Sequence, residues 1–219
     1  MTDYRQLRVD YRGQTLNESD LAKTPLEQFQ SWMLAAKDLP EPNAMMVATA
    51  DENGQPSARH VLLKDVIDEG FIFYSNYASR KGREIAANPK VSLVFPWFAI
   101  YRQVIVIGEV EKVSREESLD YFHSRPHGSQ LAALASDQSK KLSSREELER
   151  KYSELETKYP EGSTVPLPEN WGGYLVRPKA IEFWSGRSSR MHDRLVFSAT
   201  KENPNMAVES DWEVSRLSP

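Results

Sequence analysis

Apolar, β-prone segments separated by polar turn residues recur along the chain and predict a protein made mainly of strands. The strand-like segments of a first block lie at 44–50, 57–66, 71–76, 90–98 and 102–113, and those of a second block at 172–184, 194–198 and 212–217. Strands of the first block are close in sequence, and Asn53-Gly54 is a strong hairpin signal between the first two. We therefore expect an antiparallel sheet that curls into a barrel.

Helical patterns lie before, within and between these blocks. Helices are expected at 25–36, 79–88, 118–125 and 145–160. The Ser/Thr-x-x-Glu pattern of a capping box occurs at Thr24/Glu27, Ser114/Glu117 and Ser144/Glu147. The last helix is charged on all but one face, so we interpret its charges as a solvated surface. The polar segment 199–211 contains proline and asparagine, and we interpret it as a surface excursion.

The length of 219 residues suffices for one large domain or two small ones. We expect residues 1–23 to form a flexible N-terminal segment and residues 24–219 to form one α+β domain, mainly β with flanking helices. The chain has no cysteine, no signal-peptide core and no apolar run of roughly 20 residues, which predicts a cytoplasmic protein without disulfides. Its net charge of −4 argues against general nucleic-acid binding, so we interpret basic clusters as local sites.

One basic cluster lies at the expected start of the helix at 79–88. Ser79 is a plausible N-cap, which places Arg80, Lys81 and Arg83 in the first helical turn. Cations are disfavoured there by the helix dipole, so the cluster breaks a local rule. Free backbone N–H groups, a hydroxyl and several cations at one helix start would bind phosphate or carboxylate, and we favour this anion site over a basic surface turn.

Two more charged stretches are ambiguous by themselves. Arg59 and Lys64 bracket an apolar strand, and strict alternation sends them to opposite faces, so they either serve different sites or a bulge intervenes. The stretch 187–194 packs three arginines, a histidine and an aspartate between two strand-like segments. It is either a solvated hairpin tip or an anion site.

A further cluster consists of Tyr121, Arg125 and Ser129 at four-residue intervals. All three side chains can donate hydrogen bonds to phosphate oxygens. Pro126 breaks a helix at this point, so the spacing alone does not place them on one face. Three basic clusters on an acidic chain suggest more than one phosphorylated ligand.

Other motifs for chemistry are missing from the sequence. There is no G-x-G-x-x-G, no P-loop and no G-x-S-x-G, so a Rossmann site, a phosphate cradle and a hydrolase elbow have no support. His123 and His127 have the spacing of metal ligands, but the proline between them and the lack of a third ligand argue against a metal site.

Several motifs occur together in the order seen in the pyridoxine/pyridoxamine 5′-phosphate oxidase family. They are RHVLLK, YSNYASRKGREIAANP, VSLVFPW, RQVIVIGEVEKVS, YFHSRPHGSQ, WGGYLV, IEFW, RMHDR and the closing WEVSRLSP. The chain resembles this family from about Thr24 to Pro219. The resemblance implies an antiparallel FMN-binding split β-barrel that forms a homodimer, with FMN at the subunit interface.

The resemblance also implies an activity in vitamin B6 biosynthesis and salvage. Pyridoxine 5′-phosphate or pyridoxamine 5′-phosphate would be oxidised to pyridoxal 5′-phosphate. Molecular oxygen would accept the electrons and give hydrogen peroxide, and the amine substrate would release ammonia. No nucleic acid or membrane partner is implied.

The same resemblance assigns residues to the two ligands. The expected FMN contacts are Arg59, His60, Val61, Leu62, Leu63, Lys64, Tyr74, Ser75, Arg80, Lys81, Gln103, Gln138, Ser139, Trp184 and Arg194. The expected substrate contacts are Lys64, Tyr121, Arg125, Ser129, Arg190, Met191 and His192, with Arg8 and Tyr11 from an N-terminal segment that covers the substrate. Arg190 and His192 are the expected catalytic residues. Arg190 would stabilise negative charge near the ring, and His192 would hydrogen-bond the reacting group or transfer a proton.

Two alternatives use the same barrel. A non-catalytic carrier of a flavin or a vitamin B6 phosphate would not need Arg190 and His192. A related reductase would use another flavin or a deazaflavin. The cluster at Tyr121, Arg125 and Ser129 favours a phosphorylated substrate over this second alternative.

Overall fold

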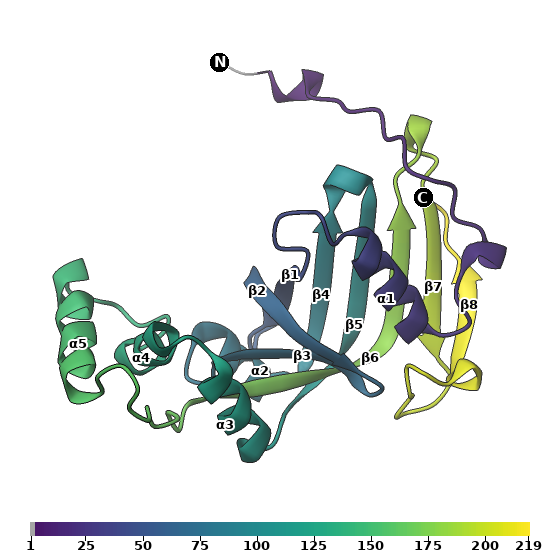
Figure 1. Ribbon diagram of the computed structural model, residues 1–219. Coiled ribbons are helices and arrows are strands. Elements are labelled where there is room, and N and C mark those ends of the chain that lie inside the picture. Colours follow the sequence, from purple (N-terminus) through teal and green to yellow (C-terminus); the bar gives the residue numbers. More distant parts are fainter. Residues whose placement is uncertain (1–2) are drawn as a thin grey trace.

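The computed structural model describes residues 3–219, and their strands form one antiparallel sheet. The strands are β1 (Ala44–Ala50), β2 (Pro56–Ile67), β3 (Gly70–Asn76), β4 (Lys90–Trp97), β5 (Arg102–Lys112), β6 (Trp171–Ser185), β7 (Asp193–Ala199) and β8 (Trp212–Arg216). Their order is β3-β2-β1-β4-β5-β6-β7-β8, and β3 also pairs with β6. Strands β1 to β6 therefore close a barrel, and β7 and β8 extend the sheet beyond it (Figure 1). The expected mainly β fold with flanking helices is confirmed.

The core fills the barrel because side chains alternate between its interior and its outer surface. In β4 the buried residues are Val91, Leu93, Phe95 and Trp97, and the residues between them are not fully buried. Helix α1 (Pro25–Ala35) packs against this core through Phe29, whose ring lies edge-on to that of Phe71 with centroids 4.9 Å apart. Aromatic pairs of this geometry add to the gain from burial.

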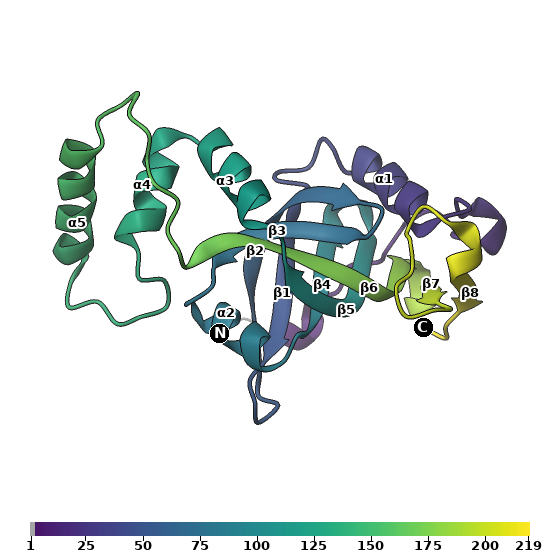
Figure 2. The same cartoon turned by 90° about the horizontal axis from the view of Figure 1, so that it is seen from below.

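Four further helices flank the barrel. They are α2 (Arg80–Ala87), α3 (Arg115–Ser124), α4 (His127–Ala135) and α5 (Arg145–Lys158). Helices α3, α4 and α5 lie together on one side, away from α1 and β7 (Figure 2). No residue of α5 is buried, which confirms its solvated charged face. No helix within residues 3–219 is long and apolar enough to cross a membrane.

One of the three expected capping boxes forms fully. At α1, Thr24 Oγ1 accepts from the Glu27 N–H (3.2 Å), and no return bond to the Glu27 carboxylate forms among residues 3–219. The Ser114/Glu117 box is present in both directions. At α5, Ser144 Oγ accepts from the Glu147 N–H (3.3 Å), but the Glu147 carboxylate accepts from the backbone N–H of Ser143 (3.2 Å) instead of Ser144. This capping box is therefore only half formed.

The alternation of β2 is broken at Lys64. Leu63 pairs with Phe73 and Asp65 pairs with Ile72, so the register shifts across Lys64. A β-bulge therefore lies at Lys64, in agreement with one of the two sequence interpretations.

The segment 199–211 differs from the expected surface excursion. Met206 is fully buried, and its carbonyl accepts a hydrogen bond from the Leu26 N–H (3.1 Å). Trp212 Nε1 donates to the Asn205 carbonyl (2.9 Å). The interpretation was wrong for the middle of this segment, because one apolar side chain among polar neighbours anchors it to the core.

The N-terminal segment runs beside the β6–β7 end of the sheet (Figure 1). Leu16 is buried at 5 % exposure, and the Gly13 N–H donates to the Gly186 carbonyl (2.8 Å). Two short 3-10 turns, Tyr4–Gln6 and Glu18–Asp20, are its regular elements.

Candidate active site

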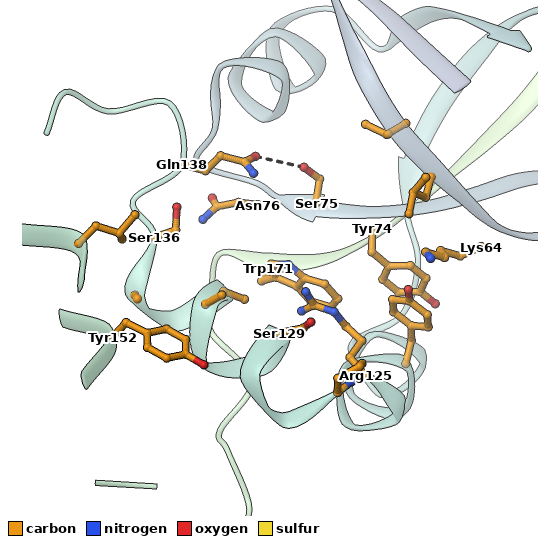
Figure 3. A pocket seen from close by; sticks show the side chains of 18 of the residues that line it. Lys64, Tyr74, Ser75, Asn76, Arg125, Ser129, Ser136, Gln138, Tyr152 and Trp171 are labelled. Carbon is orange, nitrogen blue, oxygen red and sulfur yellow. Dashed lines mark hydrogen bonds between the residues drawn. The ribbon is translucent and has the colours of Figure 1, made fainter. Parts of the chain in front are cut away.

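A cavity of about 940 Å³ lies between the barrel and the helices α3, α4 and α5. Its polar and aromatic lining comprises His60, Lys64, Tyr74, Ser75, Asn76, Lys81, Tyr121, Arg125, Ser129, Ser136, Gln138, Glu149, Tyr152, Ser153 and Trp171. The three cations in this lining are Lys64, Lys81 and Arg125, which are separate in sequence. Figure 3 shows Ser75 and Gln138 at one end, and Lys64, Tyr74 and Arg125 toward the other.

Lys81 provides a buried positive charge at the first end of the cavity. It is 8 % exposed, and its ammonium donates to Ser75 Oγ (2.9 Å) and Gln138 Oε1 (2.8 Å). Within residues 3–219 its hydrogen-bond partners are all neutral, and it forms no ion pair with a carboxylate. Burial, helped by the charge of Arg59, lowers the pKa of Lys81 to about 8. A buried cation with only neutral partners is suited to binding an anion.

The helix start beside Lys81 forms as expected. Ser79 caps α2 by accepting from the Gly82 N–H (3.2 Å). Buried Glu84, one turn later, accepts from Thr49 Oγ1 (2.5 Å) and Ser57 Oγ (2.6 Å).

Glu84 also holds two of the expected FMN contacts. It pairs with Arg80 Nε (2.7 Å) and Arg59 Nη2 (3.2 Å). Burial opposes ionisation of Glu84, but the hydrogen bonds from Ser57, Thr49, Arg80 and Arg59 outweigh it and lower the pKa to about 2. Sequence reasoning missed this role, although the i,i+4 spacing of Arg80 and Glu84 was a signal.

An aromatic wall lines the other end. The rings of Tyr74 and Tyr121 stack with centroids 3.8 Å apart, and Trp171 continues the stack 5.5 Å from Tyr74. The Arg125 guanidinium lies 4.8 Å from the centre of the Trp171 ring. Burial raises the pKa of Tyr74 to about 12, so its hydroxyl stays protonated. The sequence did not predict a role for Trp171, although the residue opens the motif WGGYLV.

The cluster at Tyr121, Arg125 and Ser129 converges on this end despite the proline. Helix α3 ends at Ser124, and Pro126 is the N-cap of α4, a short helix that the sequence analysis did not predict. All three cluster residues line the cavity. Arg125 Nη1 is buried and has no hydrogen-bond partner among residues 3–219, which leaves a donor available to a ligand.

A second group of expected site residues lies outside this cavity and consists of Gln103, Trp184, Arg194, His192 and Tyr11. In the sheet register Gln103 faces Trp184, and Trp184 faces Arg194. The His192 ring lies 4.7 Å from that of Trp184 between centroids, and the Tyr11 ring lies 5.5 Å from His192.

This second group is distant from the cavity in the same chain. Trp171 at the cavity and Trp184 in the second group lie near the two ends of β6. At roughly 3.3 Å per residue, they are about 40 Å apart along the strand. The structure thus divides the expected site residues between two ends of one chain.

Val61 and Leu62 also line the cavity, as expected. The other expected residues line neither group directly. The Leu63 side chain is buried in the core, so only its backbone can meet a ligand. Ser139, Arg190, Met191 and Arg8 are exposed. Arg190 has a φ of 61°, in the left-handed region that non-glycine residues seldom adopt.

The stretch 187–194 is more than a solvated tip. Arg187, which the sequence analysis left without a role, pairs with Asp193 (3.3 Å), and its side chain is two-thirds buried. Arg194 forms a bidentate pair with Glu182, with both N–O distances 2.8 Å.

No group of three or more metal-ligating side chains that could hold an ion occurs in residues 3–219. His123 Nε2 instead lies 3.0 Å from the carbonyl oxygen of Val165.

Two family models match the chain. Residues 34–159 match the model described as pyridoxamine 5′-phosphate oxidase. Residues 171–219 match the model described as the pyridoxine 5′-phosphate oxidase C-terminal dimerisation region.

Curated relatives and solved structures agree with these matches. A pyridoxine/pyridoxamine 5′-phosphate oxidase of Paraburkholderia phytofirmans is 49 % identical over all of both chains. One of Streptomyces avermitilis is 47 % identical over 99 % of this chain and 96 % of its own. Among solved structures, PhzG from Burkholderia lata 383, in complex with tetrahydrophenazine-1-carboxylic acid, has a TM-score of 0.84 and 27 % identity, covering 94 % of this chain and 99 % of its own. The chain therefore belongs to the pyridoxamine 5′-phosphate oxidase family.

Proposed function

We propose that this chain oxidises pyridoxine 5′-phosphate and pyridoxamine 5′-phosphate to pyridoxal 5′-phosphate, using FMN and molecular oxygen and releasing hydrogen peroxide. One observation carries the proposal: a single cavity has a cationic group at each end. Lys81 lies at one end, and Lys64 and Arg125 lie at the other. Two such groups suit two phosphorylated ligands that meet inside one cavity.

The end around Lys81 fits the phosphate of FMN. A phosphate there would give the buried ammonium the anionic partner that residues 3–219 do not supply. Ser75 and Gln138 already hold Lys81 in place and would turn toward the same ligand. When bound, FMN supplies the acceptor for a hydride, which no side chain can provide.

The other end fits the phosphate of the substrate. Tyr121, Arg125 and Ser129 offer a hydroxyl, a guanidinium and a second hydroxyl, and Arg125 Nη1 lacks a partner. Binding this phosphate would anchor the substrate away from its reacting carbon. That binding energy can then be used to align the reacting carbon with the cofactor.

Arg190 and His192 are proposed to act on the reacting part of the substrate. Because they lie at the far end of β6, they would reach the cavity of a partner subunit rather than their own. Arg190 would stabilise negative charge near the ring, and His192 would exchange a proton with the reacting group.

An apolar outer face of the barrel supports the homodimer that this arrangement needs. Met46 on β1 faces Val94 on β4, which faces Ile105 on β5, and all three point outward. Ile107, the next outward residue of β5, is 56 % exposed. On the same outer surface, the row of Gln103, Trp184 and Arg194 continues from this face. Met46, Val94 and Ile105 are partly exposed. A continuous apolar surface of this kind is typical of interaction sites.

The proposal is tested by adding FMN to the purified protein and measuring peroxide formation with pyridoxamine 5′-phosphate and with pyridoxamine, which lacks the phosphate. We expect a yellow protein that forms peroxide with the phosphorylated amine and far less with the other. A protein that FMN cannot colour, or that binds FMN and forms no peroxide, would refute it. The second result would favour the non-catalytic carrier.

A further inference from the structure

Asp193 joins three segments that are distant in sequence. It is the first residue of β7, and its side chain is 17 % exposed. Its carboxylate accepts from the Leu16 N–H (Oδ2, 3.1 Å) and pairs with Arg187 (Oδ2, 3.3 Å) and Arg216 (Oδ1, 2.9 Å). Leu16 belongs to the N-terminal segment, Arg187 follows β6, and Arg216 ends β8.

The two arginines extend this cluster to the rest of the N-terminal segment. Arg216 forms a bidentate pair with Glu18 (2.8 and 2.9 Å) and donates to the Leu16 carbonyl (3.0 Å). Arg187 donates to the Thr15 hydroxyl. We call Asp193, Arg187 and Arg216, with the residues 15–18 that they bind, the clasp.

The clasp is linked to His192 through Arg187. The Arg187 backbone N–H donates to His192 Nδ1 (3.0 Å), so the neutral imidazole carries its proton on Nε2. The N-terminal segment also brings the Tyr11 ring edge-on to the His192 ring, 5.5 Å between centroids. Arg187 therefore orients His192 with its backbone while its side chain holds the N-terminal segment.

We propose that Asp193 is a positioning residue, which couples docking of the N-terminal segment to the orientation of His192. It does not contact a ligand itself and acts through Arg187 and Leu16. The inference rests on the proposed function, since the role of His192 is part of that proposal. Arg187 and Arg216 would repel one another and lose their anchor without the carboxylate between them.

The first test measures amide hydrogen exchange by mass spectrometry on the FMN-loaded Asp193→Asn variant. Asparagine keeps the size and one oxygen but removes the charge that holds two arginines. We expect amides of residues 13–18 to exchange about tenfold faster or more than in the wild type, because the local opening equilibrium shifts. Glu111→Gln is the matched control: Glu111 pairs with Arg177 (2.8 Å) on the barrel, and its loss should leave residues 13–18 unchanged.

The second test measures kinetics on the same FMN-loaded variant. We expect the KM for pyridoxamine 5′-phosphate to rise about tenfold, because the N-terminal segment is no longer docked. We expect kcat to fall as well, because His192 is no longer held in its orientation. Arg216→Gln should give the same two effects, and the double variant should add little to either single one. This pair of variants keeps the test valid if one of them folds poorly.

Two results would overturn the inference. One is exchange at residues 13–18 that stays at the wild-type rate in Asp193→Asn. The other is faster exchange with KM and kcat unchanged, which would leave the clasp without any link to His192. A wild type without oxidase activity would refute the proposed function separately, because the exchange result does not depend on turnover.

Discussion

Replacing Lys81 with glutamine tests the cofactor end of the cavity. Lys81 is 8 % exposed and has only neutral hydrogen-bond partners, so a phosphate would be its single strong anionic partner. Losing a desolvated, charge-assisted hydrogen bond costs about 2–4 kcal/mol. The Kd for FMN should therefore rise roughly thirty- to several-hundredfold.

The folded protein should tolerate this change. The pKa of Lys81 is lowered to about 8 because burial disfavours its charged form. Removing that charge relieves the desolvation cost, so the thermal midpoint of the FMN-free protein should stay level or rise.

Fluorescence titration of FMN measures the Kd, and thermal unfolding of the FMN-free protein measures the stability. Lys90→Gln is the matched control, since Lys90 is exposed at the start of β4 and should bind FMN as the wild type does. A Kd for Lys81→Gln within about threefold of the wild type would refute the assignment of this end to the FMN phosphate.

Three further predictions concern pH, the substrate end and the buried carboxylate. FMN should bind more weakly as the pH rises above about 8, because Lys81 of the FMN-free protein then loses the proton that it needs to bind a phosphate. A Kd for FMN that stays constant from pH 7 to 9.5 in the wild type would contradict this prediction. Arg125→Ala should raise the KM for pyridoxamine 5′-phosphate by roughly ten- to a hundredfold while leaving the Kd for FMN little changed, and an unchanged KM would remove Arg125 from the substrate site. Glu84→Gln should lower the free energy of unfolding by about 2 kcal/mol at pH 7, since Glu84 pairs with Arg59 and Arg80. The pKa of Glu84 is lowered to about 2, so its stabilising effect is fully present above the ordinary pKa of a glutamate and is lost as the pH falls toward 2. Urea unfolding should therefore show the stabilities of wild type and Glu84→Gln converging as the pH falls. A difference in stability that stays constant with pH would contradict this prediction.

Local patterns were sufficient to predict most of the fold. Each of the eight strands coincides with an apolar segment bounded by turn residues, and the Asn53-Gly54 turn lies between β1 and β2. The pattern missed α4, because a nine-residue helix of small residues that starts at a proline has little periodicity. It misjudged segment 199–211, because the burial of Met206 depends on the distant backbone of Leu26.

The site was predictable in its parts but not in its arrangement. Charge and spacing marked Lys81 and Arg125 as anion ligands, and the structure brings both to one cavity. The predicted strand already separates Trp171 from Trp184, but the sequence could not show which end of β6 borders the cavity, because that depends on the pairing of β6 with β3. The partners of Arg187 were likewise hidden, since they come from residues far along the chain.

Subunit complementation between Arg125→Ala and Arg190→Ala chains tests the central claim most directly. At a pyridoxamine 5′-phosphate concentration near the wild-type KM, each homodimer of variants should form little peroxide with FMN, because both of its sites lack either Arg125 or Arg190. In a 1:1 mixture about half of the dimers combine both chains, and one of their two sites is intact, so about a quarter of the wild-type rate should return. If the wild type is active and the mixed dimers form no more peroxide than the Arg125→Ala or Arg190→Ala homodimers, a site shared between subunits is contradicted.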